Sequence, residues 1–389
     1  MITCQKEEFF LPEDVTYLNC AYMAPGLKVA EKAGIEGIKR KRLPFNIHEK
    51  DFFEPAEELR KVFSHLINCR EPKRIVIIPS VSYGIANAIK NIKIGKGENV
   101  IITSEQFPSN VYPWIKLCEE SGATLNTIHP PQDLSNRGEV WNQKLLEAIN
   151  QRTKVVAISQ THWTDGTLFD LSSIRKRTIE TNSLLIVDGT QSVGAYPFDL
   201  QEIQPDVLVC AGYKWLLGPY SIGLAYYGTQ FDNGKPLEES WINRKESHDF
   251  AKLVNYRDQY QPLSLRYEVG EHSNFILVPM MLAALTKLAE WNPVQIQNYC
   301  QSLSNEAINK LRNKGFHVEN EPHRANHLWG IKHPKLDDLK FLRSSLEATK
   351  VYVSIRGSAI RVSVNVFNDK SDLDKLVKTL IASVNATKQ

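Results

Sequence analysis

The most restrictive feature of the sequence is a long alternation of short apolar runs with amphipathic stretches, from about residue 74 to residue 228. The apolar runs lack the polar–apolar alternation of a half-exposed strand, so they are typical of strands covered on both faces. Repeated strand–helix units then predict an α/β fold with a mostly parallel, doubly wound sheet. The expected strands are residues 74–78, 99–103, 155–159, 184–187, 206–209 and 221–226.

The pattern changes after Pro279 and predicts a smaller α+β domain. Its expected helices and strands cover residues 294–314, 327–331, 336–349, 351–355, 360–364 and 369–386. We therefore expect a large domain over residues 20–280 and a small domain built from residues 1–19 and 281–389. The polar segment 231–266 is expected to be a loop or a dimer arm.

Composition excludes several classes of protein. The chain has 389 residues, 47 basic and 44 acidic, and this net charge of +3 gives no reason to expect a nucleic acid as partner. The basic run 39–42 is read as a solvated helix end. No stretch approaches the length of a membrane span, and the polar N-terminus is not that of a signal peptide. The six cysteines are scattered without a CxxC pair, which indicates reduced thiols in the cytoplasm, and neither a disulfide framework nor a zinc site.

Two charged residues lie where consecutive predicted strands end. Asp188 follows the run 184–187, and Lys214 comes shortly after the run 206–209. A lysine amine forms a Schiff base with the aldehyde of pyridoxal phosphate (PLP), and a carboxylate beside the pyridine nitrogen keeps that nitrogen protonated. The apolar neighbours of Lys214 favour a dry pocket, which lowers the pKa of the amine. The pair predicts a PLP site, although Asp188 alone also fits a capping residue.

The segment Val187–Ser192, together with Lys214 and the following Gly218-Pro219, resembles the class V aminotransferase family of fold-type I PLP enzymes. This family includes cysteine desulfurases, kynureninases and isopenicillin-epimerase-like proteins, and the resemblance extends from Tyr17 to Arg361. It implies that Lys214 acts as general base or acid at the Cα atom of an amino-acid substrate. It also implies that Gln191 hydrogen-bonds the phenolic oxygen of the cofactor.

The cofactor phosphate is expected at the start of a predicted helix. Val81 and Ser82 offer backbone N–H groups and a hydroxyl there, and the helix dipole favours an anion, although an ordinary serine cap has the same sequence. Relatives often carry Ser-Gly-His-Lys at the lysine, whereas this chain has Ala211-Gly212-Tyr213-Lys214. Tyr213 is therefore expected to replace the histidine as a phosphate donor, and Ala211 has lost a hydroxyl.

The remaining expected contacts come from four other segments. Phe107 is the candidate to stack on the cofactor ring, with a core phenylalanine as the alternative. Arg361 matches the arginine that grips the substrate α-carboxylate, with a structural salt bridge as the alternative. His162 fits a core histidine or a catalytic one. The other candidates are Trp163 and Thr164 on the cofactor side, Tyr22 and Met23 at the substrate pocket, and Ser273 and Asn274, which the resemblance directs to the phosphate of a neighbouring subunit in a homodimer.

The reaction type is predicted less narrowly than the cofactor. A cysteine desulfurase needs a mobile loop cysteine before the carboxylate arginine, but here Gly357–Ile360 runs directly into Arg361. Transamination needs only proton removal at Cα and proton return at C4′ of the cofactor, so it is the leading hypothesis. The alternatives are a kynureninase-like or cysteine/selenocysteine-lyase-like β-lyase, an epimerase, and a catalytically silent scaffold. A nicotinamide dehydrogenase is disfavoured because Gly95-Lys96-Gly97 precedes a strand instead of opening a helix.

Overall fold

The large sheet has the predicted doubly wound character. The computed structural model describes residues 2–334, 339–357 and 359–386. Seven strands form the sheet in the order β2-β8-β7-β6-β5-β3-β4, and only β8 runs antiparallel to its neighbours. The strands are β2 (Ile75–Ile78), β3 (Asn99–Thr103), β4 (Thr124–Ile128), β5 (Thr153–Ser159), β6 (Leu184–Asp188), β7 (Val207–Ala211) and β8 (Gly223–Tyr227).

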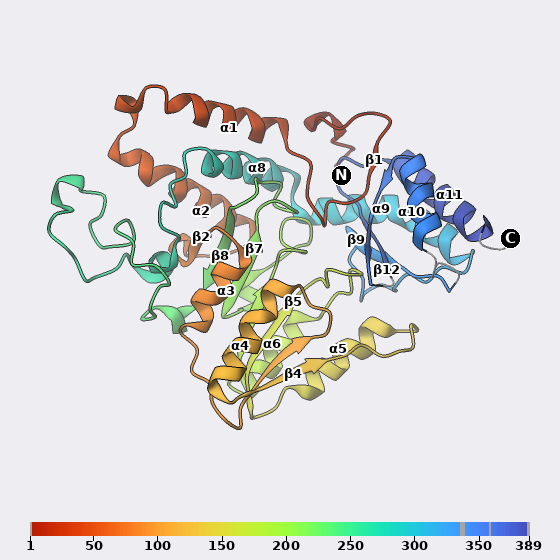
Figure 1. Ribbon diagram of the computed structural model, residues 1–389, viewed down its shortest axis with the longest axis horizontal. Coiled ribbons are helices and arrows are strands. Elements are labelled where there is room, and N and C mark those ends of the chain that lie inside the picture. Colours follow the sequence, from red (N-terminus) through yellow and green to blue (C-terminus); the bar gives the residue numbers. More distant parts are fainter. Residues whose placement is uncertain (1, 335–338, 358, 387–389) are drawn as a thin grey trace.

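Both faces of this sheet are covered, as the continuous apolar runs require. Alternate residues of β2 enter different cores, because successive side chains of a strand point to opposite faces: Ile75 and Ile77 enter one, and Val76 and Ile78 the other. Helices surround the sheet on both sides (Figure 1). They are α1 (Lys28–Arg40), α2 (Glu54–Leu66), α3 (Val81–Ile89), α4 (Tyr112–Ser121), α5 (Arg137–Ala148), α6 (Leu171–Glu180), α7 (Leu200–Ile203) and α8 (Leu277–Trp291).

The C-terminal part forms a second, smaller assembly that includes the N-terminal segment. A three-stranded antiparallel sheet has the order β11-β12-β9, and β1 pairs in parallel with β10. The predicted strand 351–355 is thus two short strands in different sheets. The elements are β1 (Thr16–Tyr17), α9 (Pro293–Arg312), β9 (Leu328–Ile331), α10 (Leu339–Ala348), β10 (Val351–Tyr352), β11 (Ser354–Arg356), β12 (Ala359–Ser363) and α11 (Lys370–Ala386).

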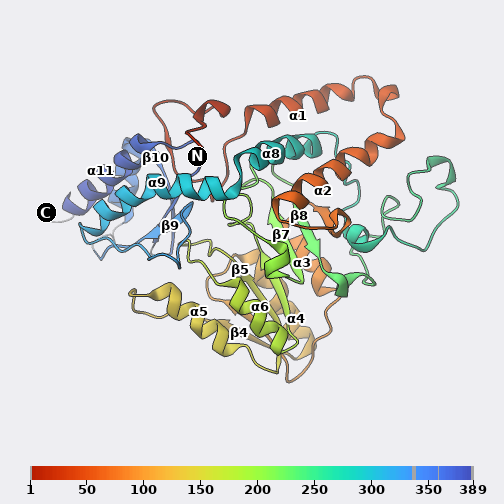
Figure 2. The ribbon, with the colours of Figure 1, turned by 180° about the vertical axis from the view of Figure 1, so that it is seen from behind.

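The division into domains at residue 280 stays a prediction. Helix α8 packs against α1 and α2, whereas α9 packs against α11 of the smaller assembly. Residues 335–338, at the start of the predicted helix 336–349, lie outside the described residues. The segment 231–266 contains short 3-10 turns and no α-helix or strand, and it extends away from the body of the chain (Figure 2). None of the helices within the described ranges is long and apolar enough to cross a membrane.

A buried ionic cluster joins α2 to the edge strand β2. Nη2 of Arg60 donates to both carboxylate oxygens of Glu268 at 2.5 Å, and the N–H of Ile77 donates to Glu268 Oε1 at 3.0 Å. Burial acts to raise the pKa of Glu268, but the Arg60 charge holds that pKa below its usual value. Nδ1 of His272 lies 3.2 Å from Glu268, and burial lowers the pKa of this histidine to about 4, so it is neutral at pH 7. The cluster therefore centres on the buried Arg60–Glu268 pair, and Arg60 Nη1 also lies 3.0 Å from the partly exposed carboxylate of Glu57.

We expect Glu268→Ala to lower the free energy of unfolding by about 3 kcal/mol, because it removes the buried partner of Arg60 and leaves only the partly exposed Glu57 to pair with that charge. Urea denaturation followed by tryptophan fluorescence measures the change. Glu58→Ala is the matched control, since Glu58 lies on the same helix as Arg60 and forms an exposed ion pair with Lys61. Equal midpoints for the two variants would show that the buried pair is not a major support of the fold.

Candidate active site

A cavity of about 300 Å³ opens where the strands of the large sheet end. The ends of five strands that run in the same direction contribute to its wall, because the carboxyl ends of parallel strands meet at one edge of a sheet. The contributing residues are Pro79 after β2, Gln106 after β3, Ser159 of β5, Asp188 of β6 and Ala211 of β7. The parallel register sets Ser159 directly opposite Asp188. Topology alone therefore creates the hollow into which the candidate residues project.

Lys214 lines this cavity on the loop after β7 and is only 5% exposed. Its amino nitrogen lies 5.1 Å from the ring centroid of Phe107 and 5.5 Å from that of Tyr213. Burial and then the charge of Arg361 lower the pKa of Lys214 to about 8, against the opposing effect of Asp188. The amine is therefore far closer to its nucleophilic, neutral form at pH 7 than a solvated lysine would be.

Asp188 lines the same cavity from the end of β6 and is almost completely buried. Its Oδ1 accepts a hydrogen bond from the N–H of Thr190 at 3.0 Å, and Thr190 Oγ1 accepts one from the N–H of Ala211 at 3.1 Å. Burial raises the pKa of Asp188. The carboxylate forms no ion pair within the described ranges, so a cationic group in the cavity would relieve the cost of its burial.

Gln191 is held in place by two partners. Its Oε1 accepts a hydrogen bond from the indole N–H of Trp215 at 2.8 Å, and its Nε2 donates to the carbonyl of Ala21 at 3.1 Å. Because an amide nitrogen carries two hydrogens, one donor remains for a ligand. Gln191 also lines the cavity, so the amide is a fixed donor at the edge of the site.

The start of α3 forms another wall of the cavity. Ser80 and Val81 line it, whereas Ser82 is exposed and lies outside the lining, with its hydroxyl 2.9 Å from that of Ser80. Ser80 Oγ accepts a hydrogen bond from the N–H of Tyr83 and so caps the helix. Tyr213 lines the cavity as well, with its ring centroid 4.6 Å from that of Tyr220. Helix N–H groups and hydroxyls of this kind suit a phosphate.

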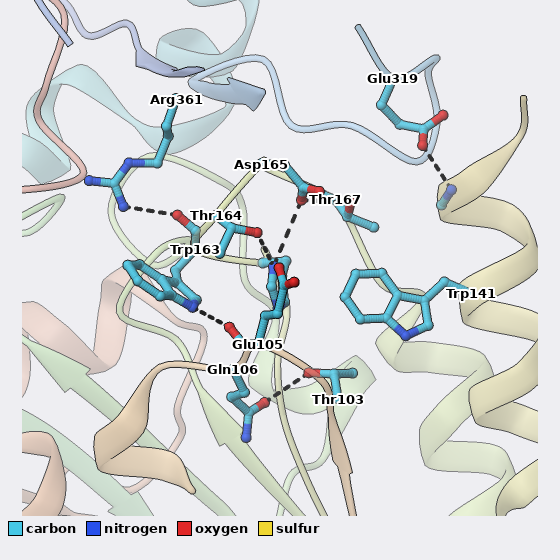
Figure 3. Close-up of polar contacts among 12 residues, drawn as sticks. Thr103, Glu105, Gln106, Trp141, Trp163, Thr164, Asp165, Thr167, Glu319 and Arg361 are labelled. Atoms are coloured by element: carbon cyan, nitrogen blue, oxygen red, sulfur yellow. Dashed lines mark hydrogen bonds and ion pairs between the residues drawn. The ribbon is translucent and has the colours of Figure 1, made fainter. Parts of the chain in front are cut away.

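The side chains of the loop after β5 point in different directions, with Trp163 on one side and Thr164 and Asp165 on the other (Figure 3). Trp163 lines the cavity, and its indole N–H donates to the carbonyl of Glu105 at 2.5 Å. Thr164 is buried outside the lining, with its hydroxyl 2.8 Å from Nδ1 of His162. The His162 ring is fully buried, packs 4.9 Å from Trp141 and has its pKa lowered by burial. This environment is that of a core histidine.

Arg361 reaches the same loop from β12. It is 1% exposed, and its Nη1 donates to the carbonyl of Trp163 at 2.9 Å (Figure 3). Its Nη2 donates to Ser354 Oγ at 3.3 Å. Burial and the charge of Arg356 lower the pKa of Arg361 to about 9, which still leaves it charged at neutral pH. A guanidinium of the small assembly thus faces the wall of the large cavity.

The four remaining candidates lie on the surface of the single chain. Tyr22 and Met23 are exposed, next to Ala24, whose N–H donates to the carbonyl of Tyr213. Ser273 and Asn274 line a separate hollow beside α1, and the Asn274 side chain accepts hydrogen bonds from the N–H groups of residues 276 and 277. They do not line the cavity that contains Lys214, and their contact with a neighbouring subunit stays a prediction.

A family model for class V aminotransferases matches residues 46–376. The chain belongs to this family. Uncharacterized aminotransferase YcbU of Bacillus subtilis (strain 168) is 25% identical over 86% of this chain and 85% of its own length. Cysteine desulfurase of Enterobacter sp. (strain 638) is 31% identical, over 44% of this chain and 41% of its own. The expectation of a PLP-dependent enzyme, aminotransferase or lyase, is confirmed by these findings.

Solved structures share the fold at low sequence identity. A C-DES Lys-to-Ala mutant with glycine covalently linked to its PLP cofactor superimposes with a TM-score of 0.85 at 17% identity, over 97% of this chain and 99% of that one. The cystine C–S lyase C-DES in complex with cysteine persulfide has a TM-score of 0.83 at 18% identity, over 95% and 98% of the two chains. The fold-type I prediction is confirmed by these similarities.

Several lining residues were not singled out from the sequence. Ser159 sits at a strand end in the same way as Asp188, so the rule that ligands bind at the carboxyl ends of strands would have identified it. Ser109, Thr190 and Ser221 belong to turns whose direction depends on packing. Across the described residues there is no cluster of three or more His, Cys, Asp or Glu side chains arranged to hold a metal.

We expect Lys214 of the cofactor-free protein to titrate near pH 8, because burial and the Arg361 charge favour the neutral amine. Competitive labelling with acetic anhydride across a pH series, read by peptide mass spectrometry, gives the midpoint. Lys61 is the internal control, because its pKa is raised by Glu58. Arg361→Gln is expected to raise the Lys214 midpoint by removing a positive charge. A wild-type Lys214 midpoint at or above that of Lys61 would contradict this account.

Proposed function

We propose that this chain is an aminotransferase that binds PLP at Lys214 and acts on an amino acid. The observation that carries the proposal is the shared cavity of Lys214 and Asp188, in which a buried amine of lowered pKa is combined with a buried carboxylate that has no ion-pair partner in the described part of the chain. PLP supplies an aldehyde that reacts with amines and a ring that withdraws electrons from the substrate.

The cavity residues fit the chemical groups of PLP. Asp188 would pair with the ring nitrogen, and the cost of burying its carboxylate supports a cationic partner. The free amide hydrogen of Gln191 would meet the phenolic oxygen, and Phe107 would cover the ring face. The phosphate would lie at the start of α3, held by N–H and O–H groups including those of Val81 and Tyr213. Ser82 lies beside this wall, and Trp163 and Thr164 belong to the loop opposite.

Two residues would handle the substrate. Arg361 would bind the α-carboxylate, since its Nε is buried without a hydrogen-bond partner in this structure and its two amino groups are fixed by Trp163 and Ser354. Lys214 Nζ would remove the proton from Cα, because a pKa of about 8 suits a base that works near neutral pH. Tyr22 and Met23 would border the entrance to the pocket.

A desulfurase that passes sulfur to a loop cysteine is disfavoured by the chain's own cysteines. Only residues 357–358 connect β11 to β12, which leaves no room for a cysteine-bearing loop before Arg361. Cys20, whose Sγ lies 3.9 Å from the carbonyl oxygen of Lys214, is completely buried, and burial raises its pKa to about 12. A lyase that needs no cysteine is the second candidate, supported by the fold similarity to the cystine C–S lyase.

We also propose that the chain works as a homodimer in the cytoplasm. Ser273 and Asn274 lie on the surface beside α1, where a second copy would be able to reach them. The exposed segment 231–266, in which Tyr256 is 96% exposed, is the candidate dimer arm.

We expect the purified protein to bind PLP with a visible absorption band that borohydride fixes covalently at Lys214. Lys214→Ala should abolish the fixed adduct, which intact-protein mass spectrometry detects. Asp188→Ala should weaken PLP binding about tenfold or more, because a charge-assisted contact in a dry site is lost. Asp133→Ala, in a surface turn, is the control and should leave binding unchanged. An adduct that persists in Lys214→Ala would exclude the proposed site.

We expect single-turnover reactions with amino acids to yield an oxo acid together with the amine form of the cofactor. The products are quantified by chromatography for the oxo acid and by the change in the visible spectrum for the cofactor. A lyase would instead release ammonia, with or without sulfide, and leave the cofactor in its aldehyde form. That second result would replace transamination with the lyase alternative while leaving the PLP site intact.

A further inference from the structure

A second arginine faces the site beside Arg361. The guanidinium carbon of Arg356 lies 5.6 Å from the centroid of the Trp163 ring, and that of Arg361 lies 5.8 Å from the same centroid. Trp163 itself lines the cavity with Lys214. The charge of Arg361, and to a smaller extent that of Arg356, lowers the pKa of Lys214. The two guanidinium groups therefore gather around one aromatic side chain at the wall of the site.

The hairpin of β11 and β12 fixes the spacing of the two arginines. Arg356 is paired with Ala359, and Arg361 with Ser354, so all four side chains point to the same face of the antiparallel pair. Arg356 and Arg361 are thus diagonal neighbours, and such residues lie about 7–8 Å apart at their Cα atoms. Two paired strands that hold their arginines at this separation can present the two guanidinium groups to two different anionic groups of one small ligand.

Neither arginine has a carboxylate partner within the described ranges. Arg356 Nη1 donates to the carbonyl of Ile355, and the hydrogen bonds of Arg361 go to a carbonyl and a hydroxyl. Nε of each is buried without a hydrogen-bond partner. Other arginines with buried side chains are paired with acids, namely Arg60 with Glu268, Arg137 with Asp165, Arg175 with Asp206 and Arg324 with Glu321.

Resting on the proposed function, we infer that the substrate is an amino acid with an acidic side chain, and that Arg356 is the residue that selects it. Arg361, which is deeper and tied to the Trp163 carbonyl, takes the α-carboxylate. Arg356, which is half-buried at the start of the turn, takes the side-chain carboxylate. Gly357 follows it in a left-handed conformation, and no atom lies within 4 Å of the position that a Cβ would occupy. Gly357 is exposed, so the end of the hairpin next to Arg356 is open to solvent.

The test compares the binding of diacids and of a monoacid to the PLP-loaded protein. These ligands carry no amino group, so the test requires no turnover. Isothermal titration calorimetry measures the Kd of succinate and glutarate against that of propionate. We expect the better diacid to bind about tenfold or more tightly than propionate, and Arg356→Gln to remove that advantage with little effect on propionate. Arg356→Lys, which keeps the charge without the planar fork, should retain part of it.

Arg152→Gln is the matched control. Arg152 is exposed and directly precedes β5, at the end of the sheet opposite the cavity, so this substitution should leave all three affinities unchanged. Equal affinities for diacids and propionate in the wild-type protein would overturn the inference. An equal loss of diacid and propionate binding in Arg356→Gln would also overturn it, because both arginines would then grip one carboxylate. Failure of the proposed function shows itself separately, as the absence of a borohydride-trapped adduct at Lys214.

Discussion

The site depends on the electrostatic balance around one buried amine. Lys214 lies in a cavity where burial and guanidinium charge favour its neutral form and Asp188 opposes them. The effects of the arginine and aspartate charges on this pKa would be weak in water, because solvent screens interactions between charges far more strongly than a dry cavity does. The arginine charges that lower the pKa of Lys214 are the same charges that, in the proposed function, would bind an anionic substrate.

The charged groups around Lys214 come from two parts of the chain, and each part is built on a different sheet. Asp188 and Lys214 follow neighbouring strands of the large sheet, whereas Arg361 belongs to a three-stranded sheet built from the C-terminal part. A hydrogen bond from Arg361 to the carbonyl of Trp163 joins the two, alongside others such as that from the N–H of Gly330 to the carbonyl of Asp165. A shift of the small sheet would thus alter substrate binding and the pKa of Lys214 together, which makes this contact a natural place for coupling between substrate binding and proton removal.

The short connection between β11 and β12 restricts the types of reaction that the site can carry out. A longer segment there would carry Arg356 away from Arg361 or cover the space beside Trp163. With only two residues between β11 and β12, the arginines are fixed as diagonal neighbours, and no buried cysteine of the described chain is among the residues that line the cavity. The same short connection that disfavours sulfur transfer through a loop cysteine therefore also holds Arg356 beside Arg361, at the subsite that we propose for a second acidic group.

The sequence by itself determined the sheet and the residues at its edge. Continuous apolar runs dictate strands buried on both faces, and residues that follow such strands must meet, so Asp188 and Lys214 were predictable together. Weakly patterned elements such as β4 and α5 were not predicted, because their amphipathic faces are defined only by the neighbours that they cover. Only the tertiary structure decided that His162 is a core residue, that Ser82 points away from the cavity, and that Arg356 joins Arg361. Each of these depends on where a side chain points after packing, and a linear pattern carries no information on that direction.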